Sequence, residues 1–565
     1  MELTAFYETV NQKIEEGDIK SLENLNPPKP EYFNWVEEVF YPLNVKNHGE
    51  EDALIWKYQD SVTAFDFNTV YHRCNQLVNF LRKHGVEQGS VIYTMLPLIP
   101  ENWYGFLAGI KGGFIIMPTA TNLVTKDLIY RYETLFPDVI IAHDLFTAEI
   151  DEAEKGVDKK IKLKIIVDGQ KEGWVAFDEV FKEPTECQAA KTKSDEPFLY
   201  FFTSGTTGLP KIVVHSHFTY PVGHLTTLSW LGCQRGDIHY NISSPGWAKF
   251  AWSSLFAPWN AGATIFVNQV TGFDAKDQLK TMQDLKVTTF CGSPTVIRML
   301  VQEDMSQYDL SLRSCCAAGE PLNPDVIDKW EKGTGVIIRD GYGQTETTAL
   351  VANLPGTKVK PGSMGKPTFL YDIGIYDDQG KEVPHLEEGI ICVKTDQQKN
   401  NGLFLEYLQD EERMAESFKN SLYYTGDKAY KDEDGYIWFI GRNDDVIKAS
   451  AYRIGPFEVE SVLIEHNDVV ETAVVASPHP LRGYAVKAFI LLRENVEPSE
   501  QLAQEIFTFS EERLAKYKVP RIIEFPQSLP KTISGKIRRI ELRSMEATTK
   551  VNKEKRTHEY FHDKY

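Results

Sequence analysis

Residues 199–211 read Leu199-Tyr200-Phe201-Phe202-Thr203-Ser204-Gly205-Thr206-Thr207-Gly208-Leu209-Pro210-Lys211. An apolar run ends in a loop of hydroxyl residues and glycines, and a lysine closes the loop. The glycines let the backbone bend until its N–H groups face a chain of phosphates, while the hydroxyls add donors and the lysine adds charge. A solvated turn would not need four hydroxyls and two glycines after a buried strand. The stretch therefore predicts a strand followed by a phosphate-binding loop.

This loop is not a Walker A motif. That motif has the pattern G-x-x-x-x-G-K-[ST], whereas here Gly205 and Gly208 stand closer together and Pro210 precedes the lysine. The loop therefore represents another class of phosphate-binding loop.

Short β-branched or aromatic runs alternate with amphipathic stretches of helical length from about residue 50 to 340. The predicted strands include 91–95, 114–117, 164–168 and 263–267, and a predicted helix covers 69–84. Such alternation is typical of layered α/β units with largely parallel sheets. From about 360 to 440 the pattern changes to short strands separated by turns, which predicts a small β-rich subdomain.

A compact α+β pattern follows Asp444. Its predicted helices cover 458–466 and 501–516, and its predicted strands cover 471–476, 487–492 and 521–525. We therefore expect a large N-terminal domain over residues 1–443 and a small C-terminal domain over residues 444–565. The polar, charged tail from about Thr548 is expected to fray.

Composition narrows the possible partners. The 565 residues favour several subdomains. The formal net charge of −20 argues against a nucleic-acid surface, so a nucleotide site must rely on backbone N–H groups and selected Lys or Arg residues. No apolar run reaches the roughly 20 residues of a membrane span, and the N-terminal residues lack a secretory pattern. We therefore expect a cytoplasmic enzyme.

The cysteines and histidines give no sign of a metal site. The seven cysteines are odd in number and form no C-x-x-C pair, which predicts free thiols. His215 and His217 stand close together, but no Cys, Asp or Glu cluster accompanies them, so zinc is not expected.

Further motifs carry residues suited to nucleotide chemistry. They are Ala317-Ala318-Gly319-Glu320-Pro321-Leu322, Asp340-Gly341-Tyr342-Gly343-Gln344-Thr345-Glu346, Tyr424-Thr425-Gly426-Asp427, Gly441-Arg442-Asn443-Asp444-Asp445 and Leu529-Pro530-Lys531-Thr532-Ile533-Ser534-Gly535-Lys536. With the 199–211 loop they make nearly the whole chain resemble the adenylate-forming superfamily of acyl-CoA synthetases, peptide-synthetase adenylation domains and luciferases.

The resemblance implies a role for each motif. The 203–211 loop would hold the β- and γ-phosphates of ATP, and Gly319, Glu320 and Pro321 would lie beside adenine. In the segment from Asp340 to Glu346, Tyr342 would stack on adenine, Thr345 would contact the adenylate and Glu346 would hold Mg²⁺. A carboxylate beside phosphates suits that ion. Asp427 would bind the ribose hydroxyls and Arg442 the nucleotide. Asp444 would be the hinge about which the small domain moves, and Lys536 would neutralise charge during adenylation.

Within this superfamily the chain is most similar to the medium-chain acyl-CoA synthetase branch, through residues 30–35, 452–460, 470–475 and 482–489. This resemblance implies a coenzyme A channel lined by Ser450, Ala451, Tyr452, Arg453 and Arg482. Ala451 departs from the family, which usually has glycine there, and its added Cβ could slow thioester formation.

The acyl pocket is predicted to exceed that of acetyl-CoA synthetases. Those enzymes carry tryptophan at the position of Gly343, so glycine indicates an acid longer than acetate. Gly246 and Trp247 are further pocket candidates, with Phe250 and Trp252 near them, although such an aromatic cluster is equally typical of core packing.

Together the motifs predict an ATP-dependent, AMP-forming acyl-CoA synthetase. Its small-molecule partners would be a medium-chain fatty or aryl carboxylic acid, ATP and coenzyme A, with Mg²⁺ as cofactor. The alternatives are transfer of the acyl group to a carrier protein or another acceptor, a luciferase-like oxygenase, and a nucleotide-binding module without activity. The sequence leaves the oligomeric state open.

Overall fold

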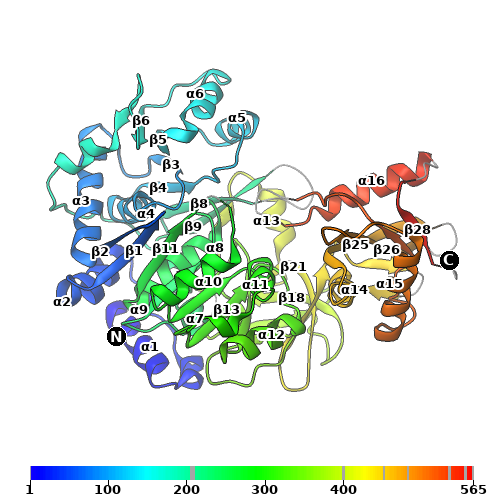
Figure 1. Cartoon of the computed structure of the whole chain (residues 1–565). Helices are drawn as coiled ribbons and strands as arrows, with labels where there is room; N and C mark the ends of the chain where they lie inside the picture. The colour runs from blue at the N-terminus through cyan, green and yellow to red at the C-terminus, as the bar shows by residue number, and fades with distance from the viewer. Residues whose placement is uncertain are drawn as a thin grey trace. The chain divides into compact units, whose positions relative to one another are not determined.

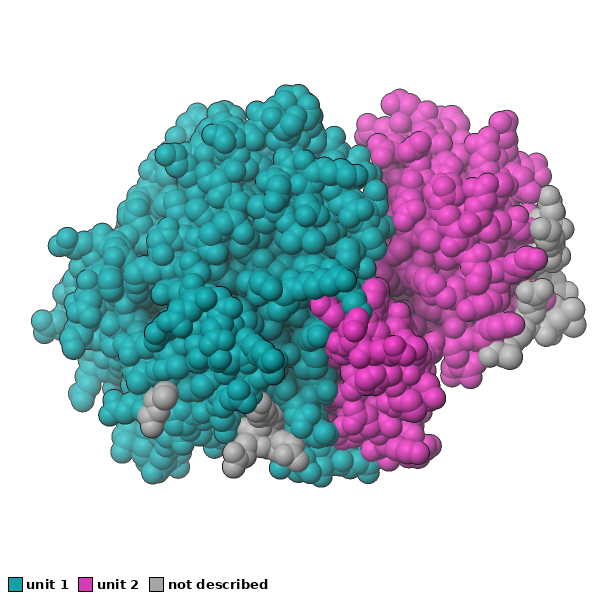
Figure 2. Space-filling view, turned by 90° about the horizontal axis from the view of Figure 1, so that it is seen from below, with its two compact units in different colours: residues 1–205, 209–373, 393–421 teal, residues 206–208, 374–392, 422–565 magenta. Residues whose placement is uncertain are grey.

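The computed structural model describes residues 2–203, 210–270, 272–396, 401–449, 452–479, 483–531, 536–552 and 556–562. Its contacts divide the chain into two compact units, shown in teal and magenta in Figure 2. Unit 1 comprises residues 1–205, 209–373 and 393–421, and unit 2 comprises residues 206–208, 374–392 and 422–565. Asp444, the predicted boundary between the two domains, falls inside unit 2. Its role as a hinge stays a prediction.

Unit 1 contains an eight-stranded sheet with the order β19-β9-β8-β4-β3-β5-β6-β7 (Figure 1). The strands are β3 (Val91–Met95), β4 (Ile115–Pro118), β5 (Val139–His143), β6 (Leu163–Val167), β7 (Val175–Ala176), β8 (Pro197–Thr203), β9 (Lys211–Ser216) and β19 (Glu406–Tyr407). The strands from β8 to β7 pair in parallel, whereas β9 pairs antiparallel with both β8 and β19.

The second sheet of unit 1 has nine strands in the order β16-β15-β14-β13-β12-β10-β11-β1-β2. They are β1 (Asp52–Tyr58), β2 (Ser61–Asp66), β10 (Ile238–Asn241), β11 (Thr264–Gln269), β12 (Thr289–Gly292), β13 (Ser314–Ala318), β14 (Ile338–Tyr342), β15 (Val351–Ala352) and β16 (Lys366–Pro367). Its middle strands are parallel. The predicted largely parallel α/β architecture is therefore confirmed, including the strands expected near residues 91, 115, 164 and 264.

Unit 1 also contains helices. They are α1 (Leu3–Glu15), α2 (Lys46–His48), α3 (Phe67–Lys83), α4 (Glu101–Gly112), α5 (Thr125–Thr134), α6 (Thr147–Lys155), α7 (Thr219–Leu231), α8 (Ala248–Ala251), α9 (Ala257–Ala261), α10 (Ala275–Asp284), α11 (Pro294–Leu300), α12 (Pro324–Thr334) and α13 (Glu411–Ser417), with π-helical segments at Val36–Val45 and Trp252–Phe256. Every residue of α7 is buried, and this helix contacts β9 of one sheet and β13 of the other. Its position explains why its apolar residues surround the whole helix rather than one face.

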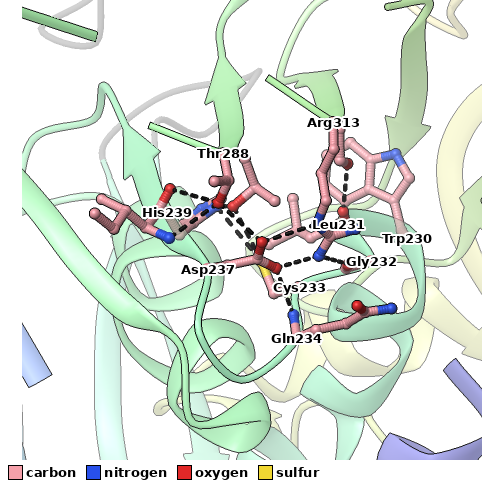
Figure 3. A network of polar contacts seen from close by, with 12 residues as sticks. Trp230, Leu231, Gly232, Cys233, Gln234, Asp237, His239, Thr288 and Arg313 are labelled. Atoms are coloured by element: carbon pink, nitrogen blue, oxygen red, sulfur yellow. Dashed lines mark hydrogen bonds and ion pairs between the residues drawn. The ribbon is translucent and has the colours of Figure 1, made fainter. Parts of the chain in front are cut away.

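A polar network holds the amino ends of three strands in the nine-stranded sheet (Figure 3). Asp237 precedes β10, Thr288 precedes β12 and Arg313 precedes β13. The Asp237 carboxylate accepts hydrogen bonds from Arg313 Nε at 2.8 Å and from Thr288 Oγ1 at 2.8 Å. Because ligands of parallel sheets bind at the opposite, carboxyl ends of the strands, this network is structural.

Unit 2 contains part of the predicted β-rich subdomain, namely residues 374–392 and 422–440, and a compact α+β part. The β-rich sheet has the order β17-β18-β21-β20, with β22 paired to β21. Its strands are β17 (Ile373–Tyr376), β18 (Gly389–Lys394), β20 (Phe418–Lys419), β21 (Leu422–Lys431) and β22 (Ile437–Arg442).

The α+β part is built on a six-stranded sheet with the order β24-β23-β26-β27-β28, in which β25 also pairs with β26. Its elements are β23 (Ile447–Ala449), β24 (Tyr452–Ile454), α14 (Pro456–Leu463), β25 (Val469–His479), β26 (Gly483–Leu492), α15 (Glu500–Arg513), β27 (Ile522–Glu524), α16 (Arg539–Asn552) and β28 (Glu559–Phe561). A core that includes Val474, Ile490 and Ile506 joins the sheet to the helices.

The predicted fraying of the tail from Thr548 is wrong for the residues described there. Strand β28 pairs antiparallel with β27, and Glu559 forms an ion pair of 2.5 Å with the buried ammonium of Lys487. Glu559 is thus a polar residue of the tail that serves as a partner of a buried lysine.

Three further expectations concern cysteines, metals and membranes. All seven cysteines are free, and six of them are buried. His215 and His217 are buried, and within the described ranges the one cluster of ligand-type side chains is Glu524, Glu546 and Glu559. Among the same residues no helix has both the length and the apolar character to cross a bilayer.

Candidate active site

The predicted phosphate-binding loop joins two paired antiparallel strands of unit 1. Thr203 ends β8 and faces Lys211, which begins β9. Ser204, Gly205, Thr206, Thr207 and Gly208 lie outside the described residues. Lys211 Nζ lies 3.0 Å from an Asp410 carboxylate oxygen. Burial alone would raise the pKa of Asp410, but the hydrogen bond from Lys211 helps to lower it.

Glu346 and Lys211 approach each other around Tyr407. The Tyr407 hydroxyl donates a hydrogen bond of 2.8 Å to Glu346 Oε1, and Lys211 Nζ lies 6.0 Å from the centre of the Tyr407 ring. Strand β19 places Tyr407 there because it pairs with β9, where Tyr407 faces Val213. Burial, together with the Glu346 carboxylate, raises the pKa of Tyr407, so the phenol stays a donor.

Further hydrogen bonds fix the backbone around Glu346. His215 Nε2 lies 2.7 Å from the Thr345 carbonyl oxygen, and the Phe404 amide donates to the Glu346 carbonyl at 2.9 Å. A carbonyl can only accept, so Nε2 of His215 carries the proton. Burial lowers the pKa of His215 to about 3, so the ring is neutral. The histidine therefore helps to position a predicted adenylate-binding segment.

The predicted nucleotide-binding segments 317–322 and 340–346 lie side by side at the carboxyl ends of the parallel strands β13 and β14. In the β13–β14 pair, Ala318 faces Gly341, so Gly319 and Tyr342 follow at the same sheet edge. Gly319 has φ +107°, which glycine tolerates best. Glu320 forms an ion pair with Arg298, whose Nη2 atom lies 3.4 Å from Glu320 Oε2.

Asp340 is buried at the end of β14. Burial raises its pKa to about 8, although the Gly341 and Leu322 amides counteract part of this effect. The carboxyl is therefore largely protonated at neutral pH. Pro321, Gly341 and Gln344 belong to the same two segments and share their location.

The predicted acyl-pocket glycines are closely packed. A Cβ at Gly246 would lie 2.5 Å from the Ala120 amide nitrogen, and one at Gly343 would lie 2.3 Å from the Thr348 carbonyl oxygen and 2.4 Å from Trp252 Cη2. Gly343 therefore leaves less open space than expected, because the Trp252 ring occupies part of it. Trp247 is half-buried, whereas Phe250 is buried against Trp103 and belongs to the core.

Unit 2 holds the remaining predicted residues. Asp427 of β21 faces Arg442 of β22, and their charged groups are 4.0 Å apart. Asp444 is exposed, as is Lys536. On β24, Arg453 and Tyr452 are exposed, and Tyr452 stacks on Tyr517 at 4.2 Å. Ser450, Ala451 and Arg482 lie outside the described residues.

Sequence reasoning did not find Tyr407, Asp410 or Trp252 as contacts of the predicted site residues. Tyr407 and Asp410 belong to no recognised motif, and only the pairing of the two-residue strand β19 with β9 brings them to Lys211. Trp252 was noted as an aromatic neighbour, but its approach to Gly343 depends on how the helical segment after Lys249 packs.

Known proteins resemble this chain over nearly its whole length. The family model "AMP-binding enzyme" matches residues 43–408, and "AMP-binding enzyme C-terminal domain" matches residues 458–536. The chain is 45% identical to 4-hydroxybutyrate–CoA ligase 1 of Metallosphaera sedula, over 98% of this chain and 97% of the relative. It is 39% identical to the mitochondrial acyl-coenzyme A synthetase ACSM3 of Mus musculus, over 92% of each.

A solved structure of the anthranilate CoA ligase AuaEII in complex with anthranoyl-AMP is also similar. It has a TM-score of 0.85 and 31% sequence identity, covering 94% of this chain and 99% of that chain. At this coverage the match extends through both units. The chain therefore belongs to the AMP-binding enzyme family.

Proposed function

We propose that this protein is an ATP-dependent, AMP-forming acid–CoA ligase that activates a medium-chain fatty or aryl carboxylic acid as an acyl-adenylate. ATP and coenzyme A are its co-substrates. The observation that carries the proposal is the grouping of Lys211 and Glu346 around Tyr407, beside the segments that end β13 and β14. Full-length similarity to CoA ligases supports it.

In the first step a carboxylate oxygen of the acid attacks the α-phosphorus of ATP. The bond to the β-phosphate breaks, and pyrophosphate leaves. Both reactants are anions, so fixed cations and N–H donors lower the barrier. We assign the cations to Lys211 and Lys536, and the phosphate contacts to Thr203 and the loop that follows it.

The nucleotide contacts are assigned by motif. Tyr342 supplies an aromatic face for adenine beside Gly319, and the Asp427 carboxylate accepts from the ribose hydroxyls. Arg442 contacts the nucleotide, and Thr345 the adenylate.

In the second step the coenzyme A thiolate attacks the acyl carbonyl, the bond to the phosphate oxygen breaks, and AMP leaves. We assign the coenzyme A channel to Tyr452 and Arg453 with Ser450, Ala451 and Arg482, and the hinge between the two steps to Asp444.

Glu346 is suited to hold Mg²⁺. It is a half-buried carboxylate, a hard oxygen ligand of the kind this ion prefers, and it lies near the base of the predicted phosphate loop. When bound, Mg²⁺ would neutralise phosphate charge. The Tyr407 hydroxyl orients the carboxylate toward its ligand, as outer hydrogen bonds do at metal sites.

We expect Tyr407→Phe to weaken the apparent affinity for Mg²⁺ by about tenfold or more, since hydrogen-bond partners of metal ligands contribute on that scale. The measurement is the rate of pyrophosphate release against Mg²⁺ concentration at saturating ATP. Tyr240→Phe is the matched control, because it removes a buried phenol that donates to Gln278 at 2.6 Å. An unchanged Mg²⁺ dependence in Tyr407→Phe would contradict the assignment.

The acid is expected to be longer than acetate but limited by Trp252. The relative from Metallosphaera sedula is named for a four-carbon hydroxy acid, and AuaEII for an aryl acid. Both are compatible with a pocket in which glycine at 343 gives room while Trp252 takes part of it. The cytoplasmic location stays a prediction.

The test is an AMP-release assay with ATP and Mg²⁺ over acids from acetate to dodecanoate, plus 4-hydroxybutyrate and benzoate, with and without coenzyme A. We expect AMP release that depends on coenzyme A, with the highest rates for acids of intermediate size. Pyrophosphate release without thioester for every acid would instead favour a carrier protein or another acceptor, with Ala451 as the first residue to examine.

A further inference from the structure

We propose that Asp410 is a positioning residue for ATP, whose carboxylate holds the ammonium group of Lys211 in place for the phosphates. This inference rests on the proposed function, which assigns Lys211 to the phosphates, and adds to it a residue that no recognised motif contains. Lys211 begins β9, and Asp410 directly precedes α13. Both residues belong to unit 1.

The two oxygens of the Asp410 carboxylate have separate partners. Oδ1 accepts a hydrogen bond of 3.0 Å from the Arg413 amide and so caps α13, whereas Oδ2 lies 3.0 Å from Lys211 Nζ. Burial alone would raise the pKa of Asp410, but Lys211 and the Arg413 amide lower it, so the carboxylate is ionised. Because the cap fixes the carboxylate, the oxygen that faces Lys211 has a defined position.

The backbone that carries Asp410 is held against β9. The Leu408 amide donates to the Ile212 carbonyl at 2.9 Å, and the Asp410 amide donates to the Tyr407 carbonyl at 3.1 Å. Within this turn Gln409 has φ +57°, in the left-handed region that residues with a Cβ seldom adopt. The turn therefore places Asp410 beside the first residue of β9.

This arrangement orders the Lys211 side chain before ATP binds. A lysine side chain has many rotamers, and ordering it at the moment of binding weakens affinity. The ammonium has three N–H donors, so it can keep its contact with Asp410 and still donate to phosphate oxygens. The Lys211 side chain is 28% exposed, which leaves part of it accessible to a ligand.

The charge of Asp410 and its positioning effect act in opposite directions on ATP. A carboxylate beside a triphosphate is repulsive, so if charge alone mattered, its removal would strengthen ATP binding. If Asp410 positions Lys211, its removal weakens ATP binding. The sign of the change in affinity therefore separates the two effects.

The experiment compares Asp410→Asn with the full-length wild type. Asparagine removes the charge but is still a good helix cap, because its side-chain oxygen can accept from the Arg413 amide. Binding of a non-hydrolysable ATP analogue is measured by calorimetry at saturating Mg²⁺, and the KM for ATP by pyrophosphate exchange. Asp274→Asn is the matched control, since Asp274 caps α10 by accepting from the Asp277 amide at 2.9 Å and forms no ion pair in the described part of the chain.

We expect Asp410→Asn to weaken analogue binding and to raise the KM for ATP by about three- to tenfold, between the usual effects of an exposed ion pair and of a charged hydrogen bond. Thioester formation from supplied acyl-AMP should change little, because that step has no β- or γ-phosphate. Asp410→Glu keeps the charge and should lose less than Asp410→Asn. In a Lys211→Met background, Asp410→Asn should have no further effect on analogue binding, since the carboxylate acts through the lysine.

Unchanged or tighter analogue binding in Asp410→Asn would overturn the inference. An equal loss of binding in the Lys211→Met background would also overturn it, because Asp410 would then act independently of Lys211. A wild type that does not bind the analogue would overturn it too. Analogue binding that depends on Asp410 through Lys211, in a protein without AMP-forming turnover, would retain the inference and reject the proposed function.

Discussion

Lys536→Ala is expected to slow adenylate formation by about 100- to 1000-fold, the scale on which removal of one preorganised electrostatic group acts. The attacking carboxylate and the α-phosphate are both anionic, and a nearby ammonium offsets the charge that develops between them. The thioester step starts from a finished adenylate and does not need this cation. The measurement is therefore each half-reaction by itself, pyrophosphate exchange for the first and thioester formation from supplied acyl-AMP for the second.

The control for this variant is Lys531→Ala. Lys531 belongs to the same motif, but it pairs with Glu471 at 2.8 Å and its side chain is 41% exposed, so both half-reactions should stay within a few-fold of the wild type. Equal losses of the two half-reactions in Lys536→Ala would contradict the assignment of Lys536 to adenylation.

Lys487→Met is expected to destabilise unit 2 by about 3–5 kcal/mol, the usual cost of removing one partner from a buried ion pair. Lys487 Nζ lies 2.7 Å from Glu524, 2.6 Å from Glu546 and 2.5 Å from Glu559, and its side chain is fully buried. Burial alone would lower the pKa of Lys487, but the carboxylates around it raise it. Without the lysine, three carboxylates face one another inside the protein.

The measurement is the free energy of unfolding in urea, followed by a signal from unit 2 at several pH values. Burial raises and Lys487 lowers the pKa of Glu546, and the net shift is downward. In the wild type, the stabilisation that comes from ionised Glu546 is present above the unfolded pKa of about 4.3. It is lost as the pH falls through the lower pKa that Glu546 has in the folded state. In Lys487→Met the three carboxylates lose the cation that they share, and protonation relieves their mutual repulsion, so the deficit should shrink toward acid pH.

Lys518→Met is the matched control for Lys487→Met. Lys518 pairs with Glu458 in the same unit at 2.5 Å, but that glutamate is 54% exposed, so the loss should stay below about 1 kcal/mol. A similarly small loss in Lys487→Met, or one independent of pH, would show that the buried cluster contributes no net stability.

Several elements were predictable because their cause is local. The strand over 91–95 is a run of β-branched, aromatic and apolar residues, and it is found with the predicted bounds. The loop after Thr203 is predicted from glycines and hydroxyls that stand next to one another, and it stays a prediction because residues 204–209 lie outside the described ranges. The helix predicted over 69–84 begins two residues earlier, since Asp66 caps it by accepting from the Thr69 amide at 2.7 Å.

Other features depend on which segments become neighbours. A strand of two residues, β19, is too short to give a periodic signal, yet its pairing with β9 brings Tyr407 to Glu346, 61 residues away in sequence. The tail after Thr548 is polar enough to suggest fraying, but β28 adds to the sheet and brings Glu559 to Lys487. In both cases the stabilising partner lies in a distant segment.

By itself, the sequence determined the layered α/β class, the smaller α+β part and the residue types at the nucleotide motifs. Alternating apolar runs and glycine-rich turns impose these features locally. Only the tertiary structure decided which charged groups have partners. Lys249 and Lys487 are the same residue type, but burial makes the state of each ammonium depend on nearby oxygens. Around Lys487 three glutamates from separate elements supply them, whereas the described residues around Lys249 supply none.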